Sequence, residues 1–181
     1  MLDYLNKPED LNHSTPGLGV GGLKDRVLQT DKGLNKQINR NGCNFRSLLA
    51  ICETFCGCLL TAEQIMKCYD LAVNEYKAML EDCSMTKYLH RIFNVFSMVT
   101  GEMIGGYQIG NIKIGYINYW NKKYFVWNAS VLRYKTDVGD HYCEGDRNGM
   151  FRWNPDQRVE LNGVKETILY WVFDPVRVNY D

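Results

Sequence analysis

Apolar residues recur every three or four positions in the N-terminal half of the chain, whereas in the C-terminal half they cluster in strand-like runs. Between Cys43 and Leu59 the spacing predicts a helix with one buried face. The stretch TAEQ has the signature of a capping box, so a second helix is expected to begin at Thr61 and to carry apolar residues as far as Leu80. A third helix is predicted in TKYLHRIFNVFSMV, ending before Gly101.

After Gly101 the chain is rich in aromatic and β-branched residues, which predicts strands. Two Asn-Gly pairs, at 148–149 and 162–163, each predict a hairpin turn. Helices followed by strands indicate an α+β fold, with N-terminal helices packed on a C-terminal antiparallel sheet. The Gly-rich residues 1–25 are expected to form an arm or loop, and residues 26–181 a single domain.

Charge and composition exclude several classes of function. The net charge is zero, which argues against a nucleic-acid partner or a membrane-surface role. No apolar run approaches the roughly 18 residues of a membrane span, and the N-terminus does not resemble a secretory signal, so a cytoplasmic location is expected. The seven cysteines are expected to be reduced and mostly buried. The spacing in CETFCGC fits neither zinc pairs nor a cluster loop, so no metal or other cofactor is expected.

Cys43 is the first candidate for chemistry, because it lies where the first helical pattern begins. Unpaired backbone N–H groups and the partial positive charge of a helix N-terminus favour a thiolate, which is one way to lower a cysteine pKa. Gly42, directly before it, allows a sharp turn and leaves space above the sulfur. The alternative is that Cys43 is a small buried residue with no chemical role.

A nucleophilic cysteine needs a base, and His141 lies on the strand that leads into the first Asn-Gly turn. Counting outwards from that turn places Cys143 opposite Asn154 and His141 opposite Asp156. Asn154 is then the diagonal neighbour of His141, at about 7–8 Å between backbones, and can orient its ring. Asp156 is the second choice for this role, because Pro155 is expected to end the strand pairing.

The order Gln37, Cys43, His141, Asn154 resembles the papain-like cysteine peptidase superfamily, including the spacing from glutamine to cysteine. The local sequence is most similar to the branch that contains the bacteriocin-leader-processing peptidases. The features shared with that branch are the Ser-Leu pair in CNFRSL, an aromatic residue after the histidine and a polar residue before Pro155. The resemblance covers roughly residues 35–173, and a similarity to uncharacterised plasmid and phage proteins of that fold is also expected.

This resemblance implies a papain-like fold and a set of roles. Cys43 attacks a carbonyl, His141 pairs with the thiolate and protonates the leaving group, and Asn154 orients His141. The Gln37 side chain and the Cys43 backbone N–H stabilise the oxyanion. The implied reaction is hydrolysis of a peptide or isopeptide-type amide bond in a protein or peptide substrate, through a thioester.

The chain departs from the family pattern beside the histidine. Cys143 and Glu144 follow the His-aromatic pair where apolar residues are usual, and Asp140 adds negative charge directly before it. These departures favour a second hypothesis, in which a catalytically silent papain-like domain binds a partner protein, as a phage or plasmid accessory factor would. Arg46 is interpreted as part of a solvated rim.

Overall fold

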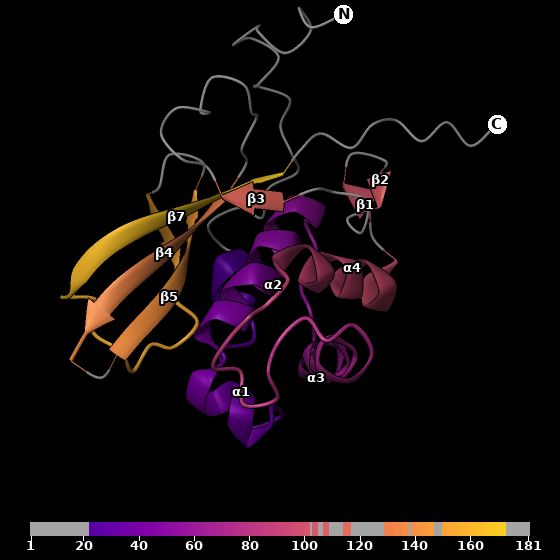
Figure 1. Cartoon of the computed structure of the whole chain (residues 1–181), viewed down its shortest axis with the longest axis horizontal. Helices are drawn as coiled ribbons and strands as arrows, with labels where there is room; N and C mark the ends of the chain where they lie inside the picture. The colour runs from indigo at the N-terminus through magenta and orange to yellow at the C-terminus, as the bar shows by residue number, and fades with distance from the viewer. Residues whose placement is uncertain are drawn as a thin grey trace, which may run out of the picture.

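In the computed structural model the chain folds as helices packed against an antiparallel sheet, which confirms the α+β prediction (Figure 1). The structure describes residues 22–101, 103–104, 107–108, 114–116, 129–137, 139–146 and 150–172. The long helix α2 (Cys43–Cys56) lies between the sheet and the other helices, and it contacts both the strand β5 (Gly139–Asp146) and the helix α4 (Leu89–Thr100). The predicted arm over residues 1–25 lies almost wholly outside the described residues.

Six helical segments precede the sheet in the described part of the chain, and capping residues mark several of their ends. They are the 3₁₀ turn η3 (Gly22–Asp25), α1 (Lys36–Asn41), α2, α3 (Ala62–Asp70), the π-helical turn η4 (Leu71–Glu75) and α4 (Leu89–Thr100). The capping box at Thr61 is present, with both of its hydrogen bonds to and from Gln64. Gly57 and Gly101 end α2 and α4 in the left-handed conformation, at φ 66° and 70°, as a C-terminal glycine commonly does.

The second predicted helix is shorter than expected. Its α-helical part ends at Asp70, the chain continues through the π turn, and Lys77 then takes a left-handed φ of 48°. The Ala78 N–H closes the end by donating to the Ala72 carbonyl at 2.7 Å. Leu80 therefore lies outside the helix, in a loop that an isolated bridge between Met79 and Thr86 holds together.

The described residues of the main sheet form five strands in the order β3-β7-β4-β5-β6, and every neighbouring pair is antiparallel. The strands are β3 (Ile114–Tyr116), β4 (Ala129–Thr136), β5 (Gly139–Asp146), β6 (Phe151–Trp153) and β7 (Val164–Val172). A separate pair joins β1 (Met103–Ile104) to β2 (Tyr107–Gln108). None of the described helices has the length and apolar character needed to cross a bilayer.

The two predicted hairpins have different outcomes. β5 and β6 pair as expected, with Glu144 opposite Trp153, although a bulge then brings Gly145 opposite Phe151. The turn residues 147–149 themselves lie outside the described residues. The second hairpin prediction is wrong: the strand that follows Gly163, β7, pairs with β4 and β3 and not with β6. A glycine is needed there because a Cβ on Gly163 would collide with the backbone carbonyl of Lys135.

The core lies on the helical side of α2. Side chains of α2, α3 and α4 meet there with essentially no exposed surface, among them Phe45, Leu48, Ile65, Phe93 and Phe96. The Phe45 and Tyr69 rings pack edge to face, with centroids 6.4 Å apart. This packing holds α2 rigidly, and therefore holds the position of its first residue, Cys43.

Candidate active site

Cys43 is the first residue of α2, as predicted, and its side chain is 9% exposed. Gly42 separates α2 from α1, which ends one residue earlier. The glycine is required by close packing and not by its φ of −80°, since a Cβ there would lie 2.6 Å from the carbonyl oxygen of Ile38. The short helix α1 and the tight junction together place Cys43 at a sharp bend in the chain.

His141 on β5 and Asn154 at the end of β6 are in direct contact, as the hairpin arithmetic predicts. The His141 Nε2 and Asn154 Oδ1 atoms are 2.7 Å apart. Asn154 Oδ1 also accepts a hydrogen bond from the Asp156 N–H at 3.0 Å, and Asn154 Nδ2 donates to the Val159 carbonyl at 3.4 Å. These contacts identify Oδ1 as the acceptor, so Nε2 carries the proton in the neutral ring. The Nδ1 atom is then the basic nitrogen.

Cys43 and His141 line the same cavity, whose volume is about 540 Å³. One wall is formed by the end of α1 and the start of α2, another by the loop at residues 83–86, and a third by the β4–β5 turn. Asp156 and Gln29 complete the lining, while Asn154 lies behind His141 and outside the lining. The structure thus brings together three of the four predicted site residues.

The fourth, Gln37, does not reach this cavity. It lies in the first turn of α1 and lines a separate hollow with Leu80, Glu81 and Asp82. The family resemblance implies that the Gln37 side chain stabilises an oxyanion beside the Cys43 sulfur. Residues 36–41 form the helix α1, capped by the Asn35 side chain, and the packing of its buried Ile38 determines which way Gln37 faces.

Burial controls the protonation of Cys43. It raises the pKa of the thiol above the ordinary value, although the backbone N–H groups of Tyr142, Asn44 and Cys43 itself lower it. The negative charge of Asp156 raises it further. The N-terminus of α2 therefore acts as expected, but desolvation outweighs it, so a neutral thiol is favoured in the unliganded protein.

Burial also lowers the pKa of His141, and this outweighs the hydrogen bond that His141 donates to Asn154 and the charge of Asp156, which both raise the pKa. His141 is consequently neutral at pH 7 and can accept a proton. Asp156, the second choice as orienting residue, directs its carboxylate to Arg158, at 2.9 Å from Nε and 2.7 Å from Nη2. Asp156 is therefore a neighbour of the pair, and Asn154 is the direct partner of His141.

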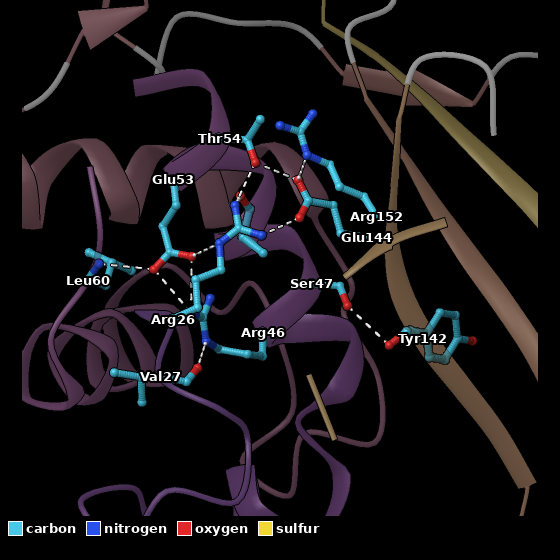
Figure 2. A network of polar contacts seen from close by, with 11 residues as sticks. Arg26, Val27, Arg46, Ser47, Glu53, Thr54, Leu60, Tyr142, Glu144 and Arg152 are labelled. Carbon is cyan, nitrogen blue, oxygen red and sulfur yellow. Dashed lines mark hydrogen bonds and ion pairs between the residues drawn. The ribbon is translucent and has the colours of Figure 1, made fainter. Parts of the chain in front are cut away.

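Further along α2 from Cys43, on the side of the helix that faces β5 and β6, lies a network of buried charges (Figure 2). Arg26 lies between Glu53 of α2 and Glu144 of β5 and pairs with both carboxylates. Arg46 binds both oxygens of Glu53, at 3.1 and 3.0 Å. All four side chains have no exposed surface. The interpretation of Arg46 as a solvated rim is thus wrong, because Glu53, further along α2, neutralises it in the interior.

Neutral groups complete this network. Thr54 Oγ1 accepts from Arg26 and donates to Glu144, with both distances at 2.6 Å. The Leu60 N–H donates to Glu53 at 3.0 Å. The centroid of the Trp153 ring lies 5.3 Å from the guanidinium carbon of Arg26 and 4.9 Å from that of Arg46, within cation–π distance of both. These contacts explain the unexpected Glu144 of β5, whose burial raises its pKa while Arg26 and Thr54 lower it.

The network connects the segments that carry the site residues. Arg46 follows Cys43 by three positions, Glu144 follows His141 by three, and Trp153 directly precedes Asn154. Ser47 Oγ adds a direct link between α2 and β5 by donating to the Tyr142 carbonyl at 3.1 Å (Figure 2). The relative position of thiol and imidazole therefore depends on contacts that are themselves shielded from water.

Sequence reasoning missed Arg26 and Gln29, which lie in the short segment before α1. Arg26 is 3% exposed and Gln29 is 2% exposed, and the Gln29 N–H donates to the Pro155 carbonyl at 2.8 Å. No local pattern marks either residue, since both partners lie far away in the sequence. In the part of the chain that the structure describes, no group of three or more His, Cys, Asp or Glu side chains is arranged to hold a metal ion.

Comparisons with protein-family models, with curated proteins and with solved structures found no match. Function is therefore inferred from the geometry of the cavity.

Proposed function

We propose that the protein is a cysteine hydrolase that cleaves a peptide or isopeptide-type amide bond through a thioester, on a papain-like scaffold. The observation that carries this proposal is the orientation of His141. Asn154 holds its Nε2–H, which leaves the basic Nδ1 in a ring that lines the same cavity as Cys43. A nucleophile, a base and a group that orients the base are the components that such chemistry requires.

The proposed reaction begins from neutral partners. As the Cys43 sulfur bonds to the substrate carbonyl carbon, its proton passes to Nδ1 of His141, and the imidazolium then donates that proton to the departing amine as the C–N bond breaks. Water attacks the resulting thioester, His141 takes a proton from it, and the acid product leaves with the thiol restored. Neutral starting groups suit this sequence because burial disfavours both the free thiolate and the free imidazolium.

A cytoplasmic location and a protein or peptide substrate belong to the same proposal. None of the six cysteines whose side chains the structure describes is in a disulfide, an arrangement compatible with a reducing compartment. The Cys43 backbone N–H at the start of α2 is the available main-chain donor for an oxyanion. The role first expected of Gln37 has no support in its position beside Glu81 and Asp82.

The second candidate is a catalytically silent domain of the same scaffold that binds a partner protein. The raised pKa of Cys43 and the distant position of Gln37 favour it. In this case Cys43 and His141 would line a binding cavity without exchanging a proton. The two candidates differ in one measurable property, which is whether the reactivity of Cys43 depends on His141.

The test is the rate of Cys43 alkylation by iodoacetamide between pH 5 and 10, followed by peptide mass spectrometry. At pH 7 the hydrolase proposal expects His141→Ala to slow Cys43 by roughly 10²-fold, the lower end of what a positioned base contributes. In the wild type the alkylation rate should fall on the acid side as His141 becomes protonated, at a pH below the ordinary histidine pKa of 6.5, because burial lowers the pKa of His141. On the alkaline side the rate should rise to the plateau of the thiolate at a pH above the ordinary thiol pKa of 9.0, because burial raises the pKa of Cys43.

The matched control is His90→Ala, since His90 belongs to α4 and the described residues that line the cavity come from other segments. Cys58, which is half-buried and outside the cavity lining, serves as an internal reference thiol in every sample. If Cys43 is alkylated at the same rate in the wild type and in His141→Ala, and Cys58 is also unchanged, then His141 does not act as a base for Cys43. This result would favour the partner-binding candidate.

A further inference from the structure

Three amide side chains line the cavity, and two of them have a determined orientation. Gln29 Nε2 donates to the Asn39 carbonyl at 3.2 Å, and Asn41 Nδ2 donates to the Asp82 carbonyl at 2.9 Å. A carbonyl oxygen only accepts, so in each case the amide nitrogen must face it. The other atom of Gln29, its buried oxygen, has no partner among the described residues, but an oxygen cannot stabilise a developing negative charge.

Asn44, the residue after Cys43, is the exception. Its amide contacts the Thr86 hydroxyl, with Nδ2 and Oγ1 3.3 Å apart. A hydroxyl can donate as well as accept, so the contact survives if the amide is turned over. The other end of the amide, occupied by Oδ1 in the structure, is buried and has no hydrogen-bond partner within the described part of the chain. A buried polar atom without a partner is costly. The other buried side-chain atoms without a partner among the described residues are Arg26 Nε, Arg46 Nη1, Arg133 Nε and Gln29 Oε1. Asn44 is the one of these residues that lines the cavity and can turn an N–H towards a ligand there, which makes its amide a candidate for a group that pairs when a ligand is present.

We propose that Asn44 is an oxyanion donor: its side-chain N–H₂, with the oxygen turned to Thr86, donates to the substrate oxygen while Cys43 attacks. This inference rests on the proposed hydrolase function and extends it. In the attack the S–C bond forms, the carbonyl π electrons move to oxygen, and the thiol proton passes to His141. A donor that faces this oxygen stabilises the charge where it develops. Asn44 thus has the role that the sequence assigned to Gln37, which lines a different hollow.

The test compares two reactions at the same sulfur. Acetylation of Cys43 by p-nitrophenyl acetate passes through a tetrahedral oxyanion, whereas alkylation by iodoacetamide is a direct displacement that forms none. Asn44→Ala should therefore slow acetylation by about 10²-fold, as loss of one oxyanion donor typically does, and leave alkylation within about twofold. His141→Ala should slow both reactions. Acetylation is followed by the burst of p-nitrophenolate, and both adducts are assigned to Cys43 by mass spectrometry.

Two further variants keep the result interpretable. Asn41→Ala removes a cavity amide whose orientation is determined by Asp82, and it should leave the ratio of acetylation to alkylation at the wild-type value. Thr86→Val removes the hydroxyl that holds Asn44 and should lower that ratio less than Asn44→Ala does. Circular dichroism and a thermal melt check that each variant is folded.

The outcomes separate this inference from the function on which it rests. If wild-type Cys43 is acetylated in a His141-dependent way but the ratio is unchanged in Asn44→Ala, the donor role is refuted and the hydrolase proposal stands. The donor role is also refuted if Asn44→Ala slows acetylation and alkylation equally, since Asn44 would then act on the thiol itself. If wild-type Cys43 is not acetylated at all, both proposals fail together.

Discussion

Two clusters of polar groups lie close to α2, and they differ in whether opposite charges are in contact. In the buried network, Arg26 and Arg46 each meet carboxylate and carbonyl oxygens, and the four charged side chains have no exposed surface, although Arg26 Nε and Arg46 Nη1 make no hydrogen bond among the described residues. In the cavity, by contrast, burial favours the uncharged forms of the Cys43 thiol and the His141 imidazole, and one end of the Asn44 amide has no partner among the described residues. The comparison separates a part of the molecule that holds geometry from the part in which we propose that chemistry takes place.

Burial acts on both clusters, but only one contains opposite charges in contact. Glu53 and Glu144 lie against guanidinium groups, which compensate in part for the loss of water, although burial still leaves the pKa of Glu144 raised. Backbone hydrogen bonds offset the burial of Cys43 only in part, as do the Asn154 bond and the Asp156 charge for His141, so the pKa of the thiol is raised and that of the imidazole is lowered. The network therefore holds paired charges in the interior, while the cavity keeps its two central groups neutral.

The largest expected effect comes from breaking the network. Arg26→Met leaves Glu144 and one oxygen of Glu53 without their buried partner, and we expect a loss of about 3–5 kcal/mol in the free energy of unfolding, measured by urea denaturation. Arg133→Met, which removes a partly exposed arginine paired with Asp140 and Glu166, is the control and should cost much less. Similar losses in the two variants would show that the buried network contributes no more than a surface pair.

A smaller effect is expected on the cavity side, from Asn154→Ala. The variant removes the side-chain hydrogen bonds to His141, to the Asp156 N–H and to the Val159 carbonyl, each of which contributes about 1 kcal/mol or less to the free energy of unfolding. Because the Asn154 bond raises the pKa of His141, its removal should move that pKa further below 6.5, which an NMR titration of the imidazole measures. Asn162→Ala, at an exposed residue that bonds Glu160, is the control. An unchanged His141 titration would mean that Asn154 does not orient the ring in solution.

The smallest expected effect is on the pH dependence of stability. The folded-state pKa of His141 lies below its unfolded value of 6.5, so the unfolded chain takes up this proton first. The contribution of His141 is therefore fully present above pH 6.5 and is lost as the pH falls towards the folded-state pKa. His141→Gln should flatten this part of the profile relative to the wild type. Parallel wild-type and variant curves between pH 7 and 5 would contradict the buried, neutral imidazole.

Local rules account for the parts of the site that the sequence predicted. The three-and-four spacing and Gly42 were enough to place Cys43 at a helix start, and strand alternation outwards from one turn was enough to bring His141 to Asn154. Both predictions concern residues within one element or one hairpin. The bulge between Glu144 and Gly145 did not disturb the second, because the pairing beyond it keeps the expected register.

Other predictions failed where partners lie far apart in the chain. The second Asn-Gly pair has the local signature of a hairpin, yet the following strand pairs with β4 across the sheet, because that edge was available and β6 is only three residues long. Arg46 seemed suited to a rim because its sequence neighbours are polar. Its burial depends on Glu53, Trp153 and the carbonyl of Val27, which meet only in the folded chain.

The sequence by itself therefore determined α2, α4, the start of α3, the helix start that carries Cys43 and the hairpin that joins His141 to Asn154. Only the tertiary structure decided that Gln37 faces away, that Arg26 lies between two carboxylates and that Asn44 lines the cavity with an amide free to turn. The physical reason is the range of the interactions. Capping and periodicity act over a few residues, whereas burial, and with it the state of every charge, is a property of the whole fold.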